Sequence, residues 1–312
     1  MKIPENFDSI IVLGPTASGK TNLAVRLAHF YQTEIISIDS RQVYKELNIG
    51  SGKDLNEYQV NGKQIPYHLI DICNLNEEFN LSLFIHHLKA SKDALSKNKI
   101  KPILCGGSGL YLESCLKRLE LGAYQLSKDL RANLESLSTE ELKTLLEKHP
   151  KFKQQYFPHD PTRMRLVRAI EALELNDEST KATDYEVFNP IILGLNPTKE
   201  IRWERIQERL ESRFKEGMVE EVIDLLSAGY SHERLQRLGL EYKYISLYLQ
   251  NKLSFNEMKL TLFYEIRRFS KRQMTYFRKI EKDGFTIHWL NSDLNKDELL
   301  EYSINIIEKG AK

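Results

Sequence analysis

Short apolar runs alternate with segments of helical spacing along the first 120 residues or so of the chain. Four runs have the length and the composition of buried strands, at residues 9–13, 34–38, 67–72 and 100–105. Two segments between them carry apolar side chains at helical spacing, residues 20–31 and 81–96. Alternation of this kind predicts an α/β fold with a parallel sheet and right-handed crossovers, whose ligands bind at the carboxyl ends of the strands.

After about residue 121 the pattern changes to helices alone, and it returns to a strand at residues 189–196. The helices predicted before this strand are residues 127–135, 139–149 and 160–175. The elements predicted after it are helices at 199–228, 240–250 and 254–280 and a strand at 286–290. We therefore predict an α/β core over residues 1–120, a helical insert over 121–189, and core completion with basic C-terminal helices over 190–312.

Composition changes this picture little. The 312 residues are 41% hydrophobic and 29% charged, and no apolar run approaches the roughly 18 to 20 residues that a membrane-spanning helix needs. The N-terminal residues lack the apolar core of an export signal, and the three cysteines fit neither a disulfide framework nor a zinc site. A cytoplasmic protein with reduced thiols is the expectation. Because the net charge is only +1, any site for a polyanion has to be local.

The sequence GPTASGKT occupies residues 14–21, directly after the first apolar run, and matches the phosphate-loop pattern G-x-x-x-x-G-K-[ST]. A chance match in a chain of this length has a probability of roughly one in a hundred. In such a loop the backbone N–H groups wrap a phosphate, the lysine supplies a cation and the threonine hydroxyl ligates Mg²⁺. The alternative is a tight turn between a strand and a helix. The predicted phosphate-binding residues are Gly14, Pro15, Thr16, Ala17, Ser18, Gly19, Lys20 and Thr21.

Two aspartates that follow predicted strands are candidates for chemistry. ATP hydrolysis or phosphoryl transfer needs an acidic residue that holds Mg²⁺, and Asp71, near the end of the run at 67–72, suits that role. Asp39 ends the neighbouring run, where its carboxylate would face the phosphate pocket and accept a proton from a nucleophile. An Asp-Ser pair is equally typical of a helix N-cap, so both interpretations of Asp39 stay open at this point.

The order and spacing of several motifs resemble those of the tRNA dimethylallyltransferase family, also called tRNA isopentenyltransferases. The motifs are GPTASGKT, DSRQVYK at 39–45, NIGSGK at 48–53, PYHLIDI at 66–72 and GGSGLY at 106–111. Three later segments are similar to the same family, at residues 159–174, 204–222 and 269–279. The resemblance covers essentially the whole chain. It implies a P-loop NTPase-like parallel sheet core with a helical insert domain and a helical C-terminal part.

The resemblance also implies a reaction in which no ATP is hydrolysed. Family members transfer a five-carbon group from dimethylallyl diphosphate to N6 of the tRNA adenine beside the anticodon, at position 37, and release pyrophosphate. In such a reaction Asp39 accepts the proton of N6, while Lys20, the loop amides and Mg²⁺ on Thr21 stabilise the leaving group. The resemblance implies that Arg213 contacts the pyrophosphate. It also implies that Thr16 and Ser108 place hydroxyl groups around the reacting centre.

A surface for tRNA is predicted in both the core and the insert. Residues 263–282 carry seven cationic side chains against two carboxylates, with Phe269, Tyr276 and Phe277 among them. The cations suit phosphate contacts, whereas the three aromatic side chains fit a helix core better than stacking on bases. The insert spaces its arginines differently from the family pattern. The residues predicted to contact tRNA are Asp39, Ser40, Arg41, Gln42, Ser108, Asp160, Arg163, Arg165 and Arg272.

Three other functions compete with this interpretation: a P-loop kinase of small molecules, an adenylate isopentenyltransferase acting on free AMP, ADP or ATP, and an RNA-binding regulator without activity. The insert and the basic terminal helix argue against a mononucleotide acceptor, which needs no extended surface. Intact Lys20, Thr21 and Asp39 argue against lost activity. We therefore expect a monomeric enzyme that uses Mg²⁺, takes dimethylallyl diphosphate and the anticodon stem-loop of a tRNA, and has no membrane partner.

Overall fold

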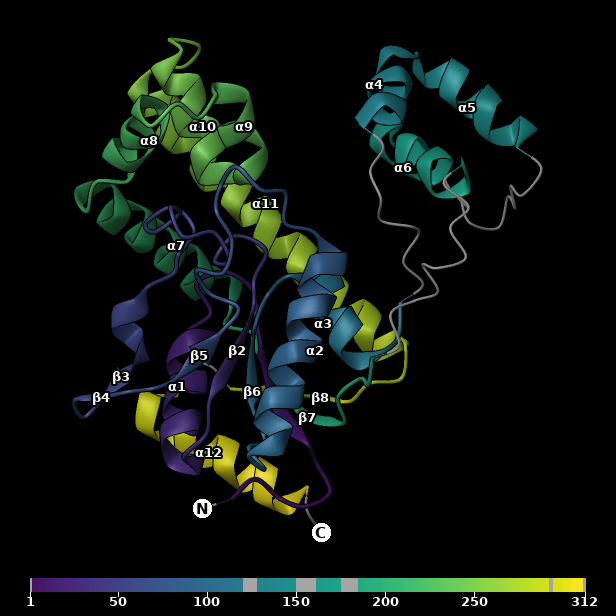
Figure 1. Cartoon of the computed structure of the whole chain (residues 1–312). Coiled ribbons are helices and arrows are strands. Elements are labelled where there is room, and N and C mark those ends of the chain that lie inside the picture. Colours follow the sequence, from purple (N-terminus) through teal and green to yellow (C-terminus); the bar gives the residue numbers. More distant parts are fainter. Residues whose placement is uncertain (1, 120–127, 150–160, 175–184, 292–293, 311–312) are drawn as a thin grey trace. The chain divides into compact units, whose positions relative to one another are not determined.

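The computed structural model describes residues 2–119, 128–149, 161–174, 185–291 and 294–310. The chain forms two compact units, one made of Met1–Lys117 and Val187–Lys312 and the other of Arg118–Glu186. The first unit contains the sheet, and the part of the second unit that the structure describes is helical (Figure 1). None of the helices in the described ranges is both long enough and apolar enough to cross a membrane.

The first unit is built on a six-stranded sheet in which all neighbouring strands run parallel. Its strands are β1 (Ser9–Leu13), β2 (Ile35–Ile38), β5 (Tyr67–His68), β6 (Ile103–Gly106), β7 (Pro190–Leu195) and β8 (Ile287–Leu290). Their order is β5-β2-β6-β1-β7-β8, and a separate antiparallel ribbon joins β3 (Gln59–Val60) and β4 (Lys63–Gln64). This sheet confirms the predicted α/β fold class.

Helices cover both faces of the sheet. The chain passes from β1 through α1 (Lys20–Tyr31) to β2 in one direction along the sheet, and from β5 through α2 (Leu81–Lys97) to β6 in the other. Because crossovers between parallel strands are right-handed, these opposite moves place α1 and α2 on opposite faces. Coverage of both faces explains why β1, β2 and β6 are buried along their whole length and appear in the sequence as continuous apolar runs.

Two further helices belong to this layered core. The short helix α3 (Gly109–Leu116) follows β6, and α12 (Lys296–Lys309) packs with α1. Ile307 of α12, Leu27 of α1 and Ile10 of β1 are all fully buried in one cluster. The C-terminal helix is therefore part of the sheet core.

A second apolar cluster joins the helices that follow β7 to the segment after β2. These helices are α7 (Lys199–Lys215), α8 (Met218–Ser227), α9 (His232–Leu238), α10 (Leu240–Leu249) and α11 (Phe255–Lys282). In Figure 1, α8, α9 and α10 gather around the N-terminal half of the long helix α11. Tyr242 of α10, Leu262 of α11 and Leu47 are all fully buried in this cluster. The cluster brings α7 and α11 to the loops at the carboxyl ends of the strands.

Two predicted elements differ from the structure. The helix expected over residues 199–228 is broken in two, because Gly217 adopts a left-handed backbone with φ of 98° between α7 and α8. The strand expected over residues 67–72 ends at His68, because Leu69 and Asp71 have positive φ angles of 62° and 57°. The helices α3, α9 and α12 were not predicted.

The second unit contains α4 (Lys128–Ser136), α5 (Thr139–Lys148) and α6 (Arg163–Glu174). Its apolar cluster includes Leu142, Leu166 and Ile170. Ser138 starts α5 with a capping box, in which its hydroxyl accepts the backbone N–H of Glu141 and the Glu141 carboxylate accepts the N–H of Ser138. The unit therefore has a helix start that its sequence encodes locally and a small core of its own.

Candidate active site

A pocket of the first unit lies at the carboxyl ends of β1, β2 and β6, where a parallel sheet is expected to bind its ligand. Seven residues predicted to be functional line it: Thr16, Lys20, Thr21, Asp39, Arg41, Gln42 and Arg213. Residues from α7, α10, α11 and the loop at residues 50–54 are also part of the wall. The structure therefore brings the phosphate loop and Asp39 together in one pocket.

The phosphate loop has the backbone that an anion cradle requires. Ala17 and Gly19 have positive φ angles of 59° and 87°, and the Ser18 N–H donates to the Pro15 carbonyl oxygen at 3.2 Å. Gly19 is the N-cap of α1 and provides no side-chain acceptor for the first amides of the helix. These amides and the positive end of the helix dipole are available to an anionic ligand.

Besides Arg41, three cations line this pocket: Lys20 at the end of the phosphate loop, and Arg209 and Arg213 from α7. Burial lowers the pKa of Lys20, and the nearby Arg209 adds to this effect. Burial likewise lowers the pKa of Arg209 to about 10, with Arg213 contributing. Asp54 lies near Arg213, with Oδ2 3.4 Å from Nη2. An anionic ligand in this pocket would offset both the burial of the cations and their mutual repulsion.

Arg209 is a pocket residue that the sequence interpretation missed. Its Nη2 donates to the Thr16 hydroxyl oxygen at 2.6 Å, so the guanidinium reaches the phosphate loop directly. Arg213, which the family resemblance had singled out, lies four residues further along α7. The four-residue spacing places both arginines on one face of the helix and was visible in the sequence.

Gln273 of α11 is the second residue that was missed. Its side-chain oxygen accepts the Thr16 backbone N–H at 2.8 Å, and its amide nitrogen donates to the Gly107 carbonyl oxygen at 3.0 Å. One buried side chain therefore joins α11, the phosphate loop and the segment after β6. The sequence contained one indication of this role, because Gln273 lies at helical spacing from Ser270 and Phe277 and therefore shares their buried face.

Gln273→Leu should destabilise the folded protein by about 1–3 kcal/mol, because it leaves the Thr16 N–H and the Gly107 carbonyl buried without partners. Urea denaturation measures this loss. Lys271→Ala, two residues earlier on the exposed face of α11, is the matched control and should change stability by less than about 0.5 kcal/mol. Equal stability of Gln273→Leu and the wild type would show that the bridge contributes nothing.

Asp39 lies in the pocket, as one of the two interpretations expected, whereas the other, a helix N-cap, is wrong because no helix follows it. Its Oδ1 accepts the backbone N–H of Arg41 at 2.8 Å and lies 3.4 Å from the N–H of Gln42. The chain that follows forms turns, so the carboxylate caps a turn and not a helix. Asp39 is half-buried and also lines the pocket. A carboxylate held by backbone amides and open to the pocket is suited to accept a proton from a bound substrate.

The residues that follow Asp39 differ in their surroundings. Arg41 donates from Nε to the Leu238 carbonyl oxygen at 2.5 Å. Gln42 accepts the Ser37 hydroxyl at 2.8 Å and donates to the Gly52 carbonyl oxygen at 2.9 Å. Ser40 is half-buried and lies outside the pocket lining. Gln42 therefore has a structural role in addition to its place in the pocket wall.

The three aromatic residues predicted as helix core separate into different environments. Phe277 is fully buried, as expected. Tyr276 is half-buried, and its hydroxyl donates to Glu113. Phe269 lines the pocket, with the guanidinium carbons of Arg41 and Arg272 at 5.7 and 5.8 Å from its ring centroid. The prediction holds for Phe277 and is wrong for Phe269, which is available to a ligand.

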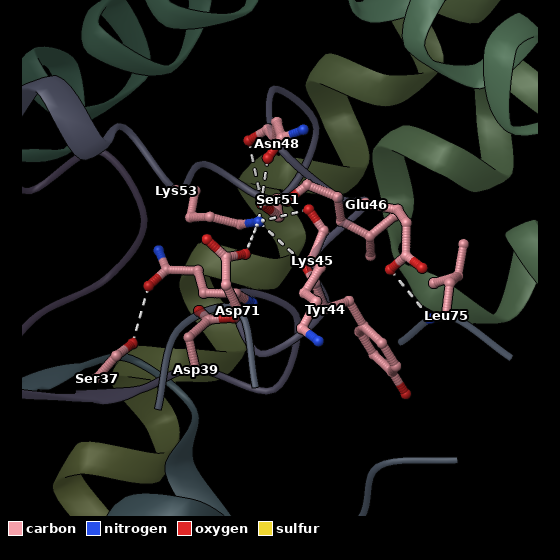
Figure 2. A network of polar contacts seen from close by, with 12 residues as sticks. Ser37, Asp39, Tyr44, Lys45, Glu46, Asn48, Ser51, Lys53, Asp71 and Leu75 are labelled. Atoms are coloured by element: carbon pink, nitrogen blue, oxygen red, sulfur yellow. Dashed lines mark hydrogen bonds and ion pairs between the residues drawn. The ribbon is translucent and has the colours of Figure 1, made fainter. Parts of the chain in front are cut away.

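Asp71, the alternative Mg²⁺ ligand, lies outside the pocket lining and is engaged elsewhere. It forms an ion pair with the ammonium group of Lys53, a side chain that is only 2% exposed (Figure 2). The early end of β5 turns Asp71 toward this lysine. The structure therefore gives no support to Asp71 as the Mg²⁺ ligand of this pocket.

The other predicted tRNA contacts lie on separate elements. Ser108 precedes α3, is half-buried and is not among the pocket-lining residues, and Arg272 is exposed on α11. In the second unit, Arg163 donates to the carbonyl oxygens of Glu135 and Leu137 at 2.5 and 2.7 Å, so it closes the end of α4. Arg165 is exposed, and Asp160 lies outside the described residues.

Comparison with known proteins extends these observations. Residues 42–280 match the family model described as IPP transferase. tRNA dimethylallyltransferase 2 of Phocaeicola vulgatus is 45% identical over 308 residues, which cover 97% of this chain and 98% of the relative. tRNA dimethylallyltransferase 1 of Parabacteroides distasonis is 42% identical over 307 residues, covering 97% and 98%.

A solved structure is similar over nearly the same extent. The full-length tRNA isopentenylpyrophosphate transferase of Bacillus halodurans has a TM-score of 0.71 against this chain, with 28% identity and 97% of both chains covered. The matched family model and the full-length relatives confirm the resemblance seen in the motifs. The chain therefore belongs to the IPP transferase family, which includes the tRNA dimethylallyltransferases.

Proposed function

We propose that this protein transfers a dimethylallyl group from dimethylallyl diphosphate to N6 of the adenine at position 37 of tRNA, beside the anticodon. The observation that carries the proposal is the meeting of Lys20 and Thr21 with Asp39 in one pocket. A phosphate-binding loop next to a carboxylate fits a reaction with a diphosphate leaving group and a proton-bearing nucleophile.

The proposed step forms a bond from N6 to C1 of the dimethylallyl group while the bond from C1 to the diphosphate oxygen breaks. The electron pair of that bond leaves with pyrophosphate. Lys20, Arg209 and Arg213 stabilise the charge that grows on it. The amine is a weak nucleophile because its lone pair is delocalised into the adenine ring, so Asp39 orients it and accepts its proton.

The residues present fit Mg²⁺ that is brought by the diphosphate. Thr21 lines the pocket, and the described residues contain no group of three or more His, Cys, Asp or Glu side chains that could hold a metal ion. Mg²⁺ is commonly bound by few protein ligands together with substrate phosphates. Thr21 would hold the ion, whose positive charge would then stabilise the leaving group.

The tRNA side of the proposal rests on charge and on Phe269. A target adenine stacked in the anticodon loop has to be splayed out to reach the pocket. Phe269, flanked by Arg41 and Arg272, offers such a base an aromatic face in the pocket wall. We propose the exposed cations of α11 and of the second unit, Arg165 among them, as phosphate contacts to the anticodon stem-loop. We also propose, as expected from the sequence, that the protein acts as a monomer in the cytoplasm.

The experiment that tests this function is incubation with dimethylallyl diphosphate and Mg²⁺ in the presence of either tRNA or AMP, followed by mass spectrometry of the nucleosides. The proposal expects N6-dimethylallyladenosine from the digested tRNA and none from AMP. Prenylated AMP with unmodified tRNA would instead identify an adenylate isopentenyltransferase. A tRNA transcript with guanine at position 37 is the matched acceptor control and should gain no prenyl group.

A further inference from the structure

The loop at residues 48–54, which we call the clamp loop, forms one wall of the pocket. Gly50, Ser51, Gly52 and Asp54 of this loop line the pocket. Gly52 and Asp54 both contact Arg213, whose guanidinium is buried. The side chain of Lys53, between them, is also buried. Its ammonium group bonds to the Tyr44 carbonyl oxygen and to the Asp71 carboxylate.

Glu221 of α8 binds the beginning of the clamp loop. Its carboxylate accepts the backbone N–H groups of Asn48 at 3.1 Å, Ile49 at 2.6 Å and Gly50 at 3.3 Å. It also accepts the hydroxyl of the fully buried Tyr242 at 2.6 Å. Glu221 is not among the residues that line the pocket. A carboxylate that accepts three successive amides fixes the backbone and is not available for chemistry on the substrate.

Lys53 anchors the other part of the loop. Its ammonium group donates to the carbonyl oxygens of Tyr44 and Lys45 at 2.9 and 3.3 Å and to the Asn48 side chain at 3.1 Å, and it pairs with Asp71 (Figure 2). The buried charge is therefore surrounded by acceptors. These contacts join the clamp loop to the turn that follows Asp39.

The clamp loop determines where the Arg213 guanidinium can lie. Gly52 packs so closely against this group that a Cβ atom at residue 52 would clash with Nη2. Gly52 also has φ of 69°, which side-chain-bearing residues rarely adopt. On the same side, Asp54 Oδ2 lies 3.4 Å from Nη2. A shift of the loop backbone would therefore move the arginine that the proposed function assigns to the diphosphate.

We propose that Glu221 is a positioning residue for prenyl transfer, acting through the clamp loop on Arg213. The proposal rests on the proposed function, because Arg213 matters here as a contact of the diphosphate. A glutamine at 221 has nearly the same shape but offers one carbonyl oxygen and one N–H₂ group. This N–H₂ group would face backbone N–H donors of the clamp loop, so some of the hydrogen bonds to the loop are lost and the loop shifts.

Glu221→Gln should lower kcat by roughly 10- to 100-fold with a smaller change in KM, since a misplacement of ~1 Å can cost about 100-fold in rate. The matched control is Glu220→Gln, which alters the exposed neighbour on the same helix and should leave kcat unchanged. Circular dichroism at the assay temperature checks that both variants are folded. A normal kcat in folded Glu221→Gln would overturn the proposal.

A double-mutant cycle separates positioning from a general structural role. In an Arg213→Ala background, Glu221→Gln should cost less than about threefold, because the group it acts on is gone. Additive losses in the two backgrounds would show that Glu221 does not act through Arg213. If Glu221→Gln does not fold, Glu221→Asp replaces it in the same cycle, since its shorter side chain withdraws the carboxylate from the three loop amides, and the same outcomes apply.

The proposed function fails separately from this inference. Wild-type protein that transfers no prenyl group to tRNA refutes the proposed function, and the cycle then has no activity to measure. Wild-type activity combined with additive losses refutes only the role of Glu221.

Discussion

Asp39→Asn should lower the turnover of prenyl transfer by roughly 10²- to 10⁴-fold and leave the affinity for dimethylallyl diphosphate nearly unchanged. The substitution removes the carboxylate that we propose as the acceptor of the N6 proton. It leaves in place the cations that we propose as contacts of the diphosphate. Single-turnover kinetics with saturating tRNA measures the rate, and titration with a non-reactive diphosphate analogue measures donor binding.

Asparagine tests the role of Asp39 as a base more specifically than alanine, because Asp39 also caps a turn and asparagine can keep that cap. Its side-chain oxygen can still accept the N–H groups of Arg41 and Gln42, so the turn is retained. Asp39→Ala should lose the same chemistry and, in addition, about 1 kcal/mol of stability with the cap. If Asp39→Asn kept more than about a tenth of wild-type turnover, Asp39 would not be the base.

Lys20→Met should weaken donor binding and also slow the reaction, with a combined loss in kcat/KM of roughly 10²- to 10³-fold. The ammonium lies in the pocket, and in the proposed reaction it would contact the diphosphate in both the ground state and the transition state. Methionine keeps the length of the apolar stem and removes the charge. Steady-state kinetics over a range of donor concentrations separates KM from kcat.

The control for this prediction is Lys97→Met, an exposed lysine in the last turn of α2, which should behave as wild type. The two pocket variants should differ from each other. Asp39→Asn is expected to lose rate alone, and Lys20→Met to lose both rate and affinity. Equal loss of donor affinity in both would contradict this division of roles.

The sequence predicted the sheet well because its signals are local. The apolar runs at β1, β2, β6 and β7 are continuous, since helices bury both faces of the sheet. The phosphate loop and α1 follow directly from the motif at residues 14–21. The strand at β5 was overestimated, because the positive φ angles of Leu69 and Asp71 that end it are not visible in an apolar run.

The sequence did not identify Arg209 and Gln273 as pocket residues, because their contacts join positions far apart in the chain. Gln273 meets Thr16 across 257 positions of the chain, and Arg209 meets the same residue across 193. The apolar spacing predicted α7 and α11 as helices, but it does not determine which face of each helix meets the phosphate loop. The family resemblance identified one arginine, Arg213, through a motif. It did not identify Arg209, which lies one helical turn earlier on the same face.

We propose that the phosphate loop holds a leaving pyrophosphate and not ATP. The most direct measurement quantifies pyrophosphate and prenylated adenine in one reaction of the protein with tRNA, dimethylallyl diphosphate and Mg²⁺, with and without added ATP. We expect one pyrophosphate released for each prenylated adenine, no requirement for ATP and no ATP consumed. Consumption of ATP without prenylated adenine would contradict it.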